Sequence, residues 1–180
     1  MQISDVHIYD RSSIEDFRGT NAKLFDESIL EGKKEFSLIE CLYIYSKKNV
    51  LRGIHYQERF PQSRIVVPIS GELLCIFVDI RKESKTFGVV DLVQIDCKKG
   101  LYVPSGMALG TLALLDSSFM CMIGENGFYP EYSRGIFWDD DSLGINWPDS
   151  VDKSAIIISE KDKTWPTIDT INIRKNENEK

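Results

Sequence analysis

The chain has 180 residues and a mass of 20.6 kDa, which is the size of one domain. Its formal net charge of −6 disfavours a general nucleic-acid-binding protein, because an acidic surface repels the phosphate backbone. Its two histidines, His7 and His55, are too few for a zinc or iron site built on three histidines of one chain.

Short segments rich in β-branched and aromatic residues recur along the chain, separated by turn residues such as Gly, Asn, Asp and Lys. In chain order, these predicted strands cover residues 6–9, 36–46, 63–70, 72–80, 88–96, 100–105, 108–115, 119–124 and 155–159. Many strands at regular spacing predict an antiparallel β-sandwich or barrel, such as a jelly roll. The apolar run 38–46 is too continuous for an exposed strand, so we expect both of its faces to be covered.

Helical signals are few. Residues 22–34 predict a short helix that ends at Gly32, and residues 154–163 predict a turn of helix. No linker divides the chain, so we expect a single domain over residues 1–173, followed by a polar C-terminal tail at residues 174–180.

The cysteine pattern and the absence of long apolar runs indicate the cellular environment. The four cysteines form no CxxC pair, which disfavours a zinc ribbon and a thioredoxin-type motif. Cys41, Cys75 and Cys121 lie inside apolar runs and are interpreted as buried, reduced thiols, which suit the cytoplasm. No signal-peptide pattern is visible, and no apolar run approaches the roughly 18 residues that span a membrane. We therefore expect a cytoplasmic protein that binds neither membrane nor nucleic acid.

The stretch VLRGIHYQ at residues 50–57 holds the densest set of chemically active groups, with Arg52, His55 and Gln57 beside Gly53. In a regular strand alternate residues share a face, so His55 and Gln57 would lie on one side and Arg52 on the other. A bend at Gly53 would bring Arg52 and His55 to one pocket. From spacing alone, an ordinary strand with a structural histidine remains the alternative.

Further motifs follow one another along the chain. They are DFRG at 16–19, FVDIR and SKTFG within 77–88, YVPSG at 102–106, YPEYSRGIFWDD and GINWP within 129–148, and ISEKD at 158–162. Together with VLRGIHYQ, this ordered set resembles the signature of the dTDP-4-dehydrorhamnose 3,5-epimerases, which are cupin-type nucleotide-sugar enzymes. The resemblance implies a mainly all-β fold, a cupin-like jelly-roll β-sandwich with a few short peripheral helices. It also implies a homodimer, in which an N-terminal strand crosses to the partner, and a site without metal or other cofactor.

The resemblance further implies an epimerase of a nucleoside-diphosphate 4-keto-6-deoxy sugar, acting at C3, C5 or both in deoxysugar or surface-polysaccharide biosynthesis. A C4 ketone acidifies the hydrogens on its neighbouring carbons, so a neutral base removes a proton and leaves an enolate. A cation or hydrogen-bond donor stabilises the enolate oxygen. An acid on the opposite face then returns a proton and inverts the centre.

The resemblance assigns three catalytic residues. His55 is the base, since the neutral form of imidazole is available near pH 7. Asp162 is the carboxylate that holds the imidazole ring and stabilises its protonated form. Arg64 stands where the family has a lysine near the sugar carbonyl; it keeps the positive charge but cannot give up a proton.

Five residues are predicted to bind the substrate. Arg18 and Arg52 match family positions that contact the phosphates, which a guanidinium binds through paired hydrogen bonds. Gln57 and Phe128 lie in motifs that border the site, and Trp138 lies in the matched RGIFWDD segment. For Trp138, packing in the core is the alternative.

The sequence departs from the family at the acid of the far face. Phe128 stands two residues before Pro130, where the family has a tyrosine, and phenylalanine donates no proton. The candidate replacements are Tyr129 redirected by a local bulge, Tyr132, Cys121 or a bound water.

Three further departures remove polar groups or change their charge. Leu109 stands at the position of a second family histidine, and Glu40 and Leu42 stand where the family has glutamine and asparagine. All imidazole chemistry therefore falls on His55.

Three functions fit this mixture of matches and departures. The first is an epimerase that acts at one or both carbons with a different acid. The second is another enolate reaction, such as keto-sugar isomerisation, in which no proton returns to the opposite face. The third is a non-catalytic homologue that binds a sugar nucleotide. The retained pair of His55 and Asp162 favours catalysis.

Overall fold

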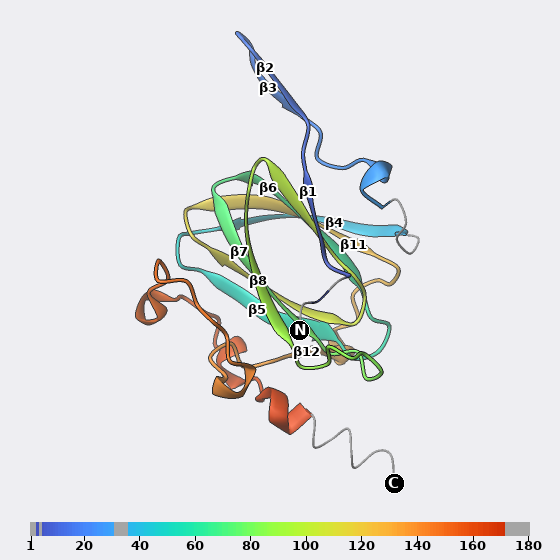
Figure 1. Cartoon of the computed structure of the whole chain (residues 1–180), viewed down its shortest axis with the longest axis vertical. Coiled ribbons are helices and arrows are strands. Elements are labelled where there is room, and N and C mark those ends of the chain that lie inside the picture. The colour runs from blue at the N-terminus through green and yellow to red at the C-terminus, as the bar shows by residue number, and fades with distance from the viewer. Residues whose placement is uncertain (1–2, 4, 31–35, 172–180) are drawn as a thin grey trace.

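The computed structural model of the protein describes residues 3, 5–30 and 36–171. Within these residues, two five-stranded antiparallel sheets face each other (Figure 1), which confirms the predicted β-sandwich. The first sheet has the order β1 (His7–Asp10), β9 (Lys99–Val103), β6 (Ser63–Ser70), β11 (Ser117–Gly124) and β4 (Leu38–Ser46). The second has the order β12 (Ser133–Gly135), β5 (Leu51–Gln57), β10 (Met107–Ala113), β7 (Glu72–Asp79) and β8 (Val90–Asp96).

The main core lies between the two sheets, because alternate residues of both sheets point inward. Val66 and Phe119 come from the first sheet, and Leu73 and Phe77 come from the second; all four are almost fully buried. Burial of each such side chain stabilises the fold by about 1.5 to 3 kcal/mol.

A second apolar layer covers the outer face of the second sheet. Leu74 and Ile76 of β7 point to this side, where Trp138, Trp147 and other side chains of the segment after β12 pack. That segment contains only short helical turns among its described residues. They are η3 (Asp141–Leu143), η4 (Lys153–Ala155), η5 (Asp162–Thr164) and the helical residues 168–171, whereas the turn η2 (Pro130–Tyr132) directly precedes β12.

Two predictions of local structure are wrong. The helix expected over residues 22–34 is replaced, in its described part, by the end of β3 and the 3-10 turn η1 (Glu27–Leu30); its expected end at Gly32 lies outside the described residues. The strand expected over residues 155–159 forms only one bridge, between Val50 and Ile157. Its Ile156 and Ile158 side chains pack onto the outer layer of the second sheet, whereas Ile157 is exposed. The turns η4 and η5 overlap the two ends of the helical turn expected over residues 154–163.

β4 is an edge strand, and one of its faces is open. This contradicts the expectation that both of its faces are covered. On its outer side Ile39, Tyr43 and Tyr45 are 49%, 66% and 51% exposed. The apolar run therefore marks a surface that the described part of a single chain leaves open.

A hairpin of β2 (Ser13–Asp16) and β3 (Gly19–Ala22) projects away from the sandwich, as Figure 1 shows. Phe17 at its tip is 98% exposed, and Ile14 is 74% exposed. A two-stranded hairpin on its own is at best marginally stable in water, so this arm lacks the packing that would fix it.

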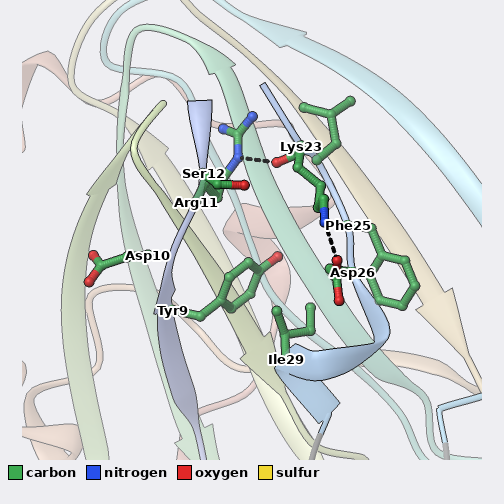
Figure 2. Close-up of a pocket in the computed structure, with 9 residues that line it drawn as sticks. Tyr9, Asp10, Arg11, Ser12, Lys23, Phe25, Asp26 and Ile29 are labelled. Atoms are coloured by element: carbon green, nitrogen blue, oxygen red, sulfur yellow. Dashed lines mark hydrogen bonds and ion pairs between the residues drawn. The ribbon is translucent and has the colours of Figure 1, made fainter. Parts of the chain in front are cut away.

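The base of the hairpin is held to the sandwich by Arg11 (Figure 2). Its guanidinium donates to the backbone carbonyls of Lys23, Pro68 and Cys97. Lys23 in turn pairs with Asp26. Arg11, Lys23 and Asp26 border a small hollow of about 250 Å³ that contains none of the predicted site residues.

The FVDIR and SKTFG motifs have a structural role in the turn between β7 and β8. Asp79 is fully buried and accepts hydrogen bonds from the Arg81 guanidinium and from the hydroxyls of Ser84 and Thr86 at 2.6–2.7 Å. Burial alone would raise the pKa of Asp79, but these hydrogen bonds hold it well below its usual range. The motif therefore fixes a turn and does not reach the cavity described below.

The cysteines are reduced, and three of them were expected to be buried. All four cysteines are free; Cys75 and Cys121 are buried as expected, whereas Cys41 is exposed because it lies on the open face of β4. In the part of the chain that is described, no helix is both long and apolar enough to cross a membrane.

Candidate active site

A cavity of about 640 Å³ opens between the two sheets. The second sheet contributes one wall through β5 and β10, and residues 157–162 extend that wall. The first sheet contributes the opposite wall through β4, β6 and β11. Six of the eight residues predicted for the site line this cavity. They are Arg52, His55, Gln57, Arg64, Phe128 and Asp162.

The bend predicted at Gly53 is a β-bulge. Leu109 of β10 pairs with His55, but Thr111 pairs with Arg52, so β5 has one extra residue between these pairs. The extra residue reverses the alternation of side chains, and both Arg52 and His55 line the cavity. Gly53 has φ of +122°, and a Cβ there would lie 2.6 Å from the Cα of Gly110. Only glycine fits this position.

His55 and Asp162 form a close pair on the second-sheet wall. The imidazole Nε2 lies 2.6 Å from Asp162 Oδ1. The carboxylate residue is 5% exposed, whereas the histidine side chain is 37% exposed. The imidazole is thus open to the cavity, and its carboxylate partner is shielded from water.

The turn η5 places Asp162, with two residues that the sequence analysis missed. The backbone amide of Asp162 donates to Ser159 Oγ at 3.1 Å, and the Trp165 indole donates to Asp162 Oδ1 at 2.9 Å. Burial alone would raise the pKa of Asp162, but hydrogen bonding to His55 and Trp165 brings it below its usual value. The spacing of three residues on either side of Asp162 was the only signal for these contacts, and it becomes meaningful only in a tight turn.

Arg64 reaches from β6 across the cavity. Its guanidinium donates to the backbone carbonyl of His55 at 3.1 Å and to Gln62 Oε1 at 3.4 Å. Among the described residues, no carboxylate lies within 4.0 Å of it, in contrast to Arg18, Arg81 and Arg134. Burial lowers the pKa of Arg64, but a guanidinium stays protonated at neutral pH. The cavity therefore holds a positive charge without a protein counter-charge.

Arg52 and Gln57 lie on the second-sheet wall but differ in burial and in the number of their hydrogen bonds. Arg52 is exposed and donates to Ser46 Oγ at 3.0 Å. Gln57 is buried, donates to the carbonyls of Phe60 and Gly127, and accepts from the backbone amide of Tyr129. The amide of Gln57 is therefore engaged in holding the loop that carries Phe128.

Two predicted residues are not brought to the cavity. Arg18 lies at the tip of the β2–β3 hairpin, where it pairs with Asp16 at 2.6 Å. Trp138 packs edge-to-face against Trp147, with 5.9 Å between ring centroids, in the outer layer of the second sheet. The alternative considered for Trp138, packing in the core, is thus what the fold shows.

The wall from the first sheet is mostly apolar. Besides Arg64 it presents the 8% exposed Cys121, and its other cavity-lining side chains in β4, β6 and β11 are hydrophobic. These hydrophobic residues are Leu42, Ile44, Val66, Phe119 and Ile123. Phe128 lies at the rim and is 54% exposed.

The two tyrosines considered as replacement acids lie elsewhere. Tyr129 and Tyr132 pack against Phe60, with ring centroids 5.1 and 5.7 Å from it. Neither tyrosine is among the residues that line the cavity.

Comparisons with known proteins support a relationship over nearly the whole chain. Residues 1–170 match the family model described as dTDP-4-dehydrorhamnose 3,5-epimerase. A relative from Methanothermobacter thermautotrophicus with the same description is 38% identical over 154 residues, which cover 83% of this chain and 82% of the relative.

Two solved structures are similar in fold. One is a dTDP-6-deoxy-D-glucose-3,5-epimerase from Legionella pneumophila in complex with dTDP-4-keto-L-rhamnose, with a TM-score of 0.84, 28% identity and coverage of 97% of this chain and 93% of the other. The other is a 3'-monoepimerase from Streptomyces bikiniensis in complex with dTDP-quinovose, with a TM-score of 0.86, 26% identity and coverage of 97% and 89%.

Proposed function

Because the chain belongs to the dTDP-4-dehydrorhamnose 3,5-epimerase family, we propose that His55 removes a proton next to the ketone of a dTDP-linked 4-keto-6-deoxy sugar. The observation that carries this proposal is the 2.6 Å contact between His55 and the shielded Asp162, beside the unpaired charge of Arg64. The cavity of about 640 Å³ has room for the sugar between the two walls.

Asp162 prepares His55 to act as a base. The carboxylate accepts the Nε2 proton of the neutral imidazole, which leaves the lone pair on Nδ1. Nδ1 takes a proton from C3 or C5 of the sugar, and Asp162 stabilises the imidazolium that results. The lowered pKa of Asp162 keeps it negatively charged through this step.

Arg64 stabilises the negative charge that develops on the sugar oxygen. Its guanidinium donates to the His55 carbonyl and has no carboxylate partner in the described part of the chain, so the enolate oxygen becomes its counter-charge. Arg64 donates hydrogen bonds to the enolate but cannot supply the proton that completes epimerisation. Arg52 at the rim is positioned for the diphosphate.

A homodimer in the cytoplasm is part of this proposal. The open outer face of β4 and the projecting hairpin with its 98% exposed Phe17 support an interface with a second copy. Four free cysteines support a reducing compartment. Light scattering is expected to give twice the mass of the chain, and Tyr43→Asp is expected to give the monomer. A wild-type monomer at micromolar concentration would contradict the dimer.

The reaction is tested with dTDP-4-dehydro-6-deoxyglucose in D2O, followed by NMR at C3 and C5. The wild-type protein is expected to exchange and invert one or both carbons. His55→Asn is expected to slow exchange by about 100- to 10,000-fold. His7→Asn is the matched control, because His7 is the only other histidine and lies on β1 outside the cavity.

The outcomes separate the candidate functions. Equal exchange in wild type and His55→Asn would refute the base. Exchange without inversion would favour keto-sugar isomerisation, a candidate that Phe128 at the rim supports because it supplies no proton. Saturable binding without any exchange would favour the non-catalytic homologue.

A further inference from the structure

Inversion of a carbon needs a proton donor on the face opposite His55. The described cavity has hydroxyl or ammonium groups on the wall that carries His55, or on the segment beside it. They belong to Tyr56, Thr111, Ser133, Ser159 and Lys161. They approach the sugar from the same side as the base. Among the described side chains, a donor for the other face must therefore come from the first-sheet wall, and a bound water is the alternative that the test below separates.

Among the described residues that line that wall, a single side chain is able to give up a proton. Phe128 has no acidic proton, and Tyr129 and Tyr132 pack on Phe60 outside the lining. Arg64 keeps its proton at neutral pH. Cys121, on β11 at the inner face of the first sheet, lines the cavity and carries an S–H group.

On the basis of the proposed epimerase function, we propose that the Cys121 thiol is the acid that reprotonates the sugar carbon on the face opposite His55. His55 Nδ1 takes the proton of the C–H bond, and the electron pair of that bond moves into the enolate beside Arg64. The enolate then re-forms the C=O bond as its carbon takes the proton of the S–H group. The products are the inverted carbon, an imidazolium and a thiolate. Water takes one proton from the imidazolium and returns one to the thiolate, so no proton is gained or lost.

The surroundings of Cys121 suit a donor that must be protonated before each turnover. Burial raises the pKa of the Cys121 thiol, so it holds its proton in the resting enzyme. The charge of Arg64 acts in the opposite direction and stabilises the thiolate once the proton has left. The same guanidinium donates to the backbone carbonyl of His55 at 3.1 Å, so one cation both influences the thiol and contacts the strand that carries His55.

The test measures exchange and inversion separately with dTDP-4-dehydro-6-deoxyglucose in D2O. In Cys121→Ala, inversion is expected to fall by about 100-fold or more. Deuterium exchange is expected to persist in the recovered substrate. Without the acid, the enolate lives long enough for His55 to exchange its proton with solvent and to return a deuteron to the same face. Cys121→Ser keeps the side-chain volume and is expected to invert at a rate between those of the wild type and Cys121→Ala.

Cys75→Ala is the matched control, because Cys75 is buried in the same core cluster but does not line the cavity. It is expected to keep the wild-type ratio of inversion to exchange. A merely structural role of Cys121 would lower both rates together and leave that ratio unchanged.

The outcomes distinguish this inference from the function on which it rests. Wild-type inversion in Cys121→Ala would overturn the role of Cys121 alone. Exchange without inversion by the wild-type protein would overturn the epimerase function and favour keto-sugar isomerisation. No exchange by the wild-type protein would overturn the epimerase itself.

Discussion

The two walls of the cavity are built on different principles. On the second-sheet wall, His55 and Asp162 are held by a bulge, a tight turn and hydrogen bonds that leave each polar group in a defined place. On the first-sheet wall, one cation and one thiol stand in an otherwise hydrophobic surface. In the proposed mechanism, removal of a proton relies on a hydrogen-bond network, whereas its return relies on a single buried thiol and on the shape of the cavity around it.

The contribution of the first-sheet wall to proton removal can be tested at Arg64, its only cation among the described residues that line the cavity. Arg64→Met keeps much of the side-chain length but removes the charge that stabilises the enolate. We expect exchange in D2O to slow by about 100- to 1,000-fold. Arg59→Met is the control, since Arg59 lies over the Tyr132 ring and not in the cavity. Unchanged exchange in Arg64→Met would mean that the second-sheet wall suffices.

The architecture of the second-sheet wall can be tested at Gly53. Gly53→Ala places a methyl group against the backbone of Gly110 and is expected to lower the free energy of unfolding by about 3 kcal/mol. Gly88→Ala is the matched control: Gly88 also has a positive φ but open space around it, so a loss of roughly 1 kcal/mol is expected. Urea denaturation measures both. Equal losses would show that the close approach in the bulge is not what requires glycine.

The charge of the shielded carboxylate gives the smallest expected effect, a change in stability with pH. Because the pKa of Asp162 is lower in the folded chain than in the unfolded chain, it stabilises the fold above the unfolded pKa, and this contribution is lost as pH falls through the folded pKa. Asp162→Asn is expected to cost about 1 to 3 kcal/mol at pH 7.

The difference between Asp162→Asn and the wild type is expected to shrink as the pH falls below about 4. Asp149→Asn, at an exposed position, controls for the loss of one negative charge. A difference that does not depend on pH would mean that Asp162 contributes through its shape and not through its charge.

The two walls also differ in how far the sequence predicted them. The polar residues of the second-sheet wall belong to short sequence motifs, so VLRGIHYQ and ISEKD indicated His55 and Asp162. Gly53 indicated the bend in β5. Trp165 was missed because only a 3-10 turn brings it to Asp162. The fold class followed from strand spacing in the same way, since turn residues mark strands locally.

Features that depend on distant packing were harder to predict. Arg18 lies in a matching motif, but no local rule says where a projecting hairpin points. Trp138 also lies in a motif and packs behind the second sheet. The role proposed for Cys121 required knowing that Tyr129 and Tyr132 turn towards Phe60, which alternation along a strand does not reveal.

The central claim is that one wall removes the proton and the other wall returns one. It is tested most directly by the position of solvent deuterium early in the reaction. The wild-type protein is incubated with dTDP-4-dehydro-6-deoxyglucose in D2O and stopped at low conversion. With separate proton carriers on the two faces, the inverted product carries deuterium at the reacting carbon, while the recovered substrate keeps its original hydrogen. Equal labelling of product and recovered substrate would show that one carrier serves both faces, and would contradict this account.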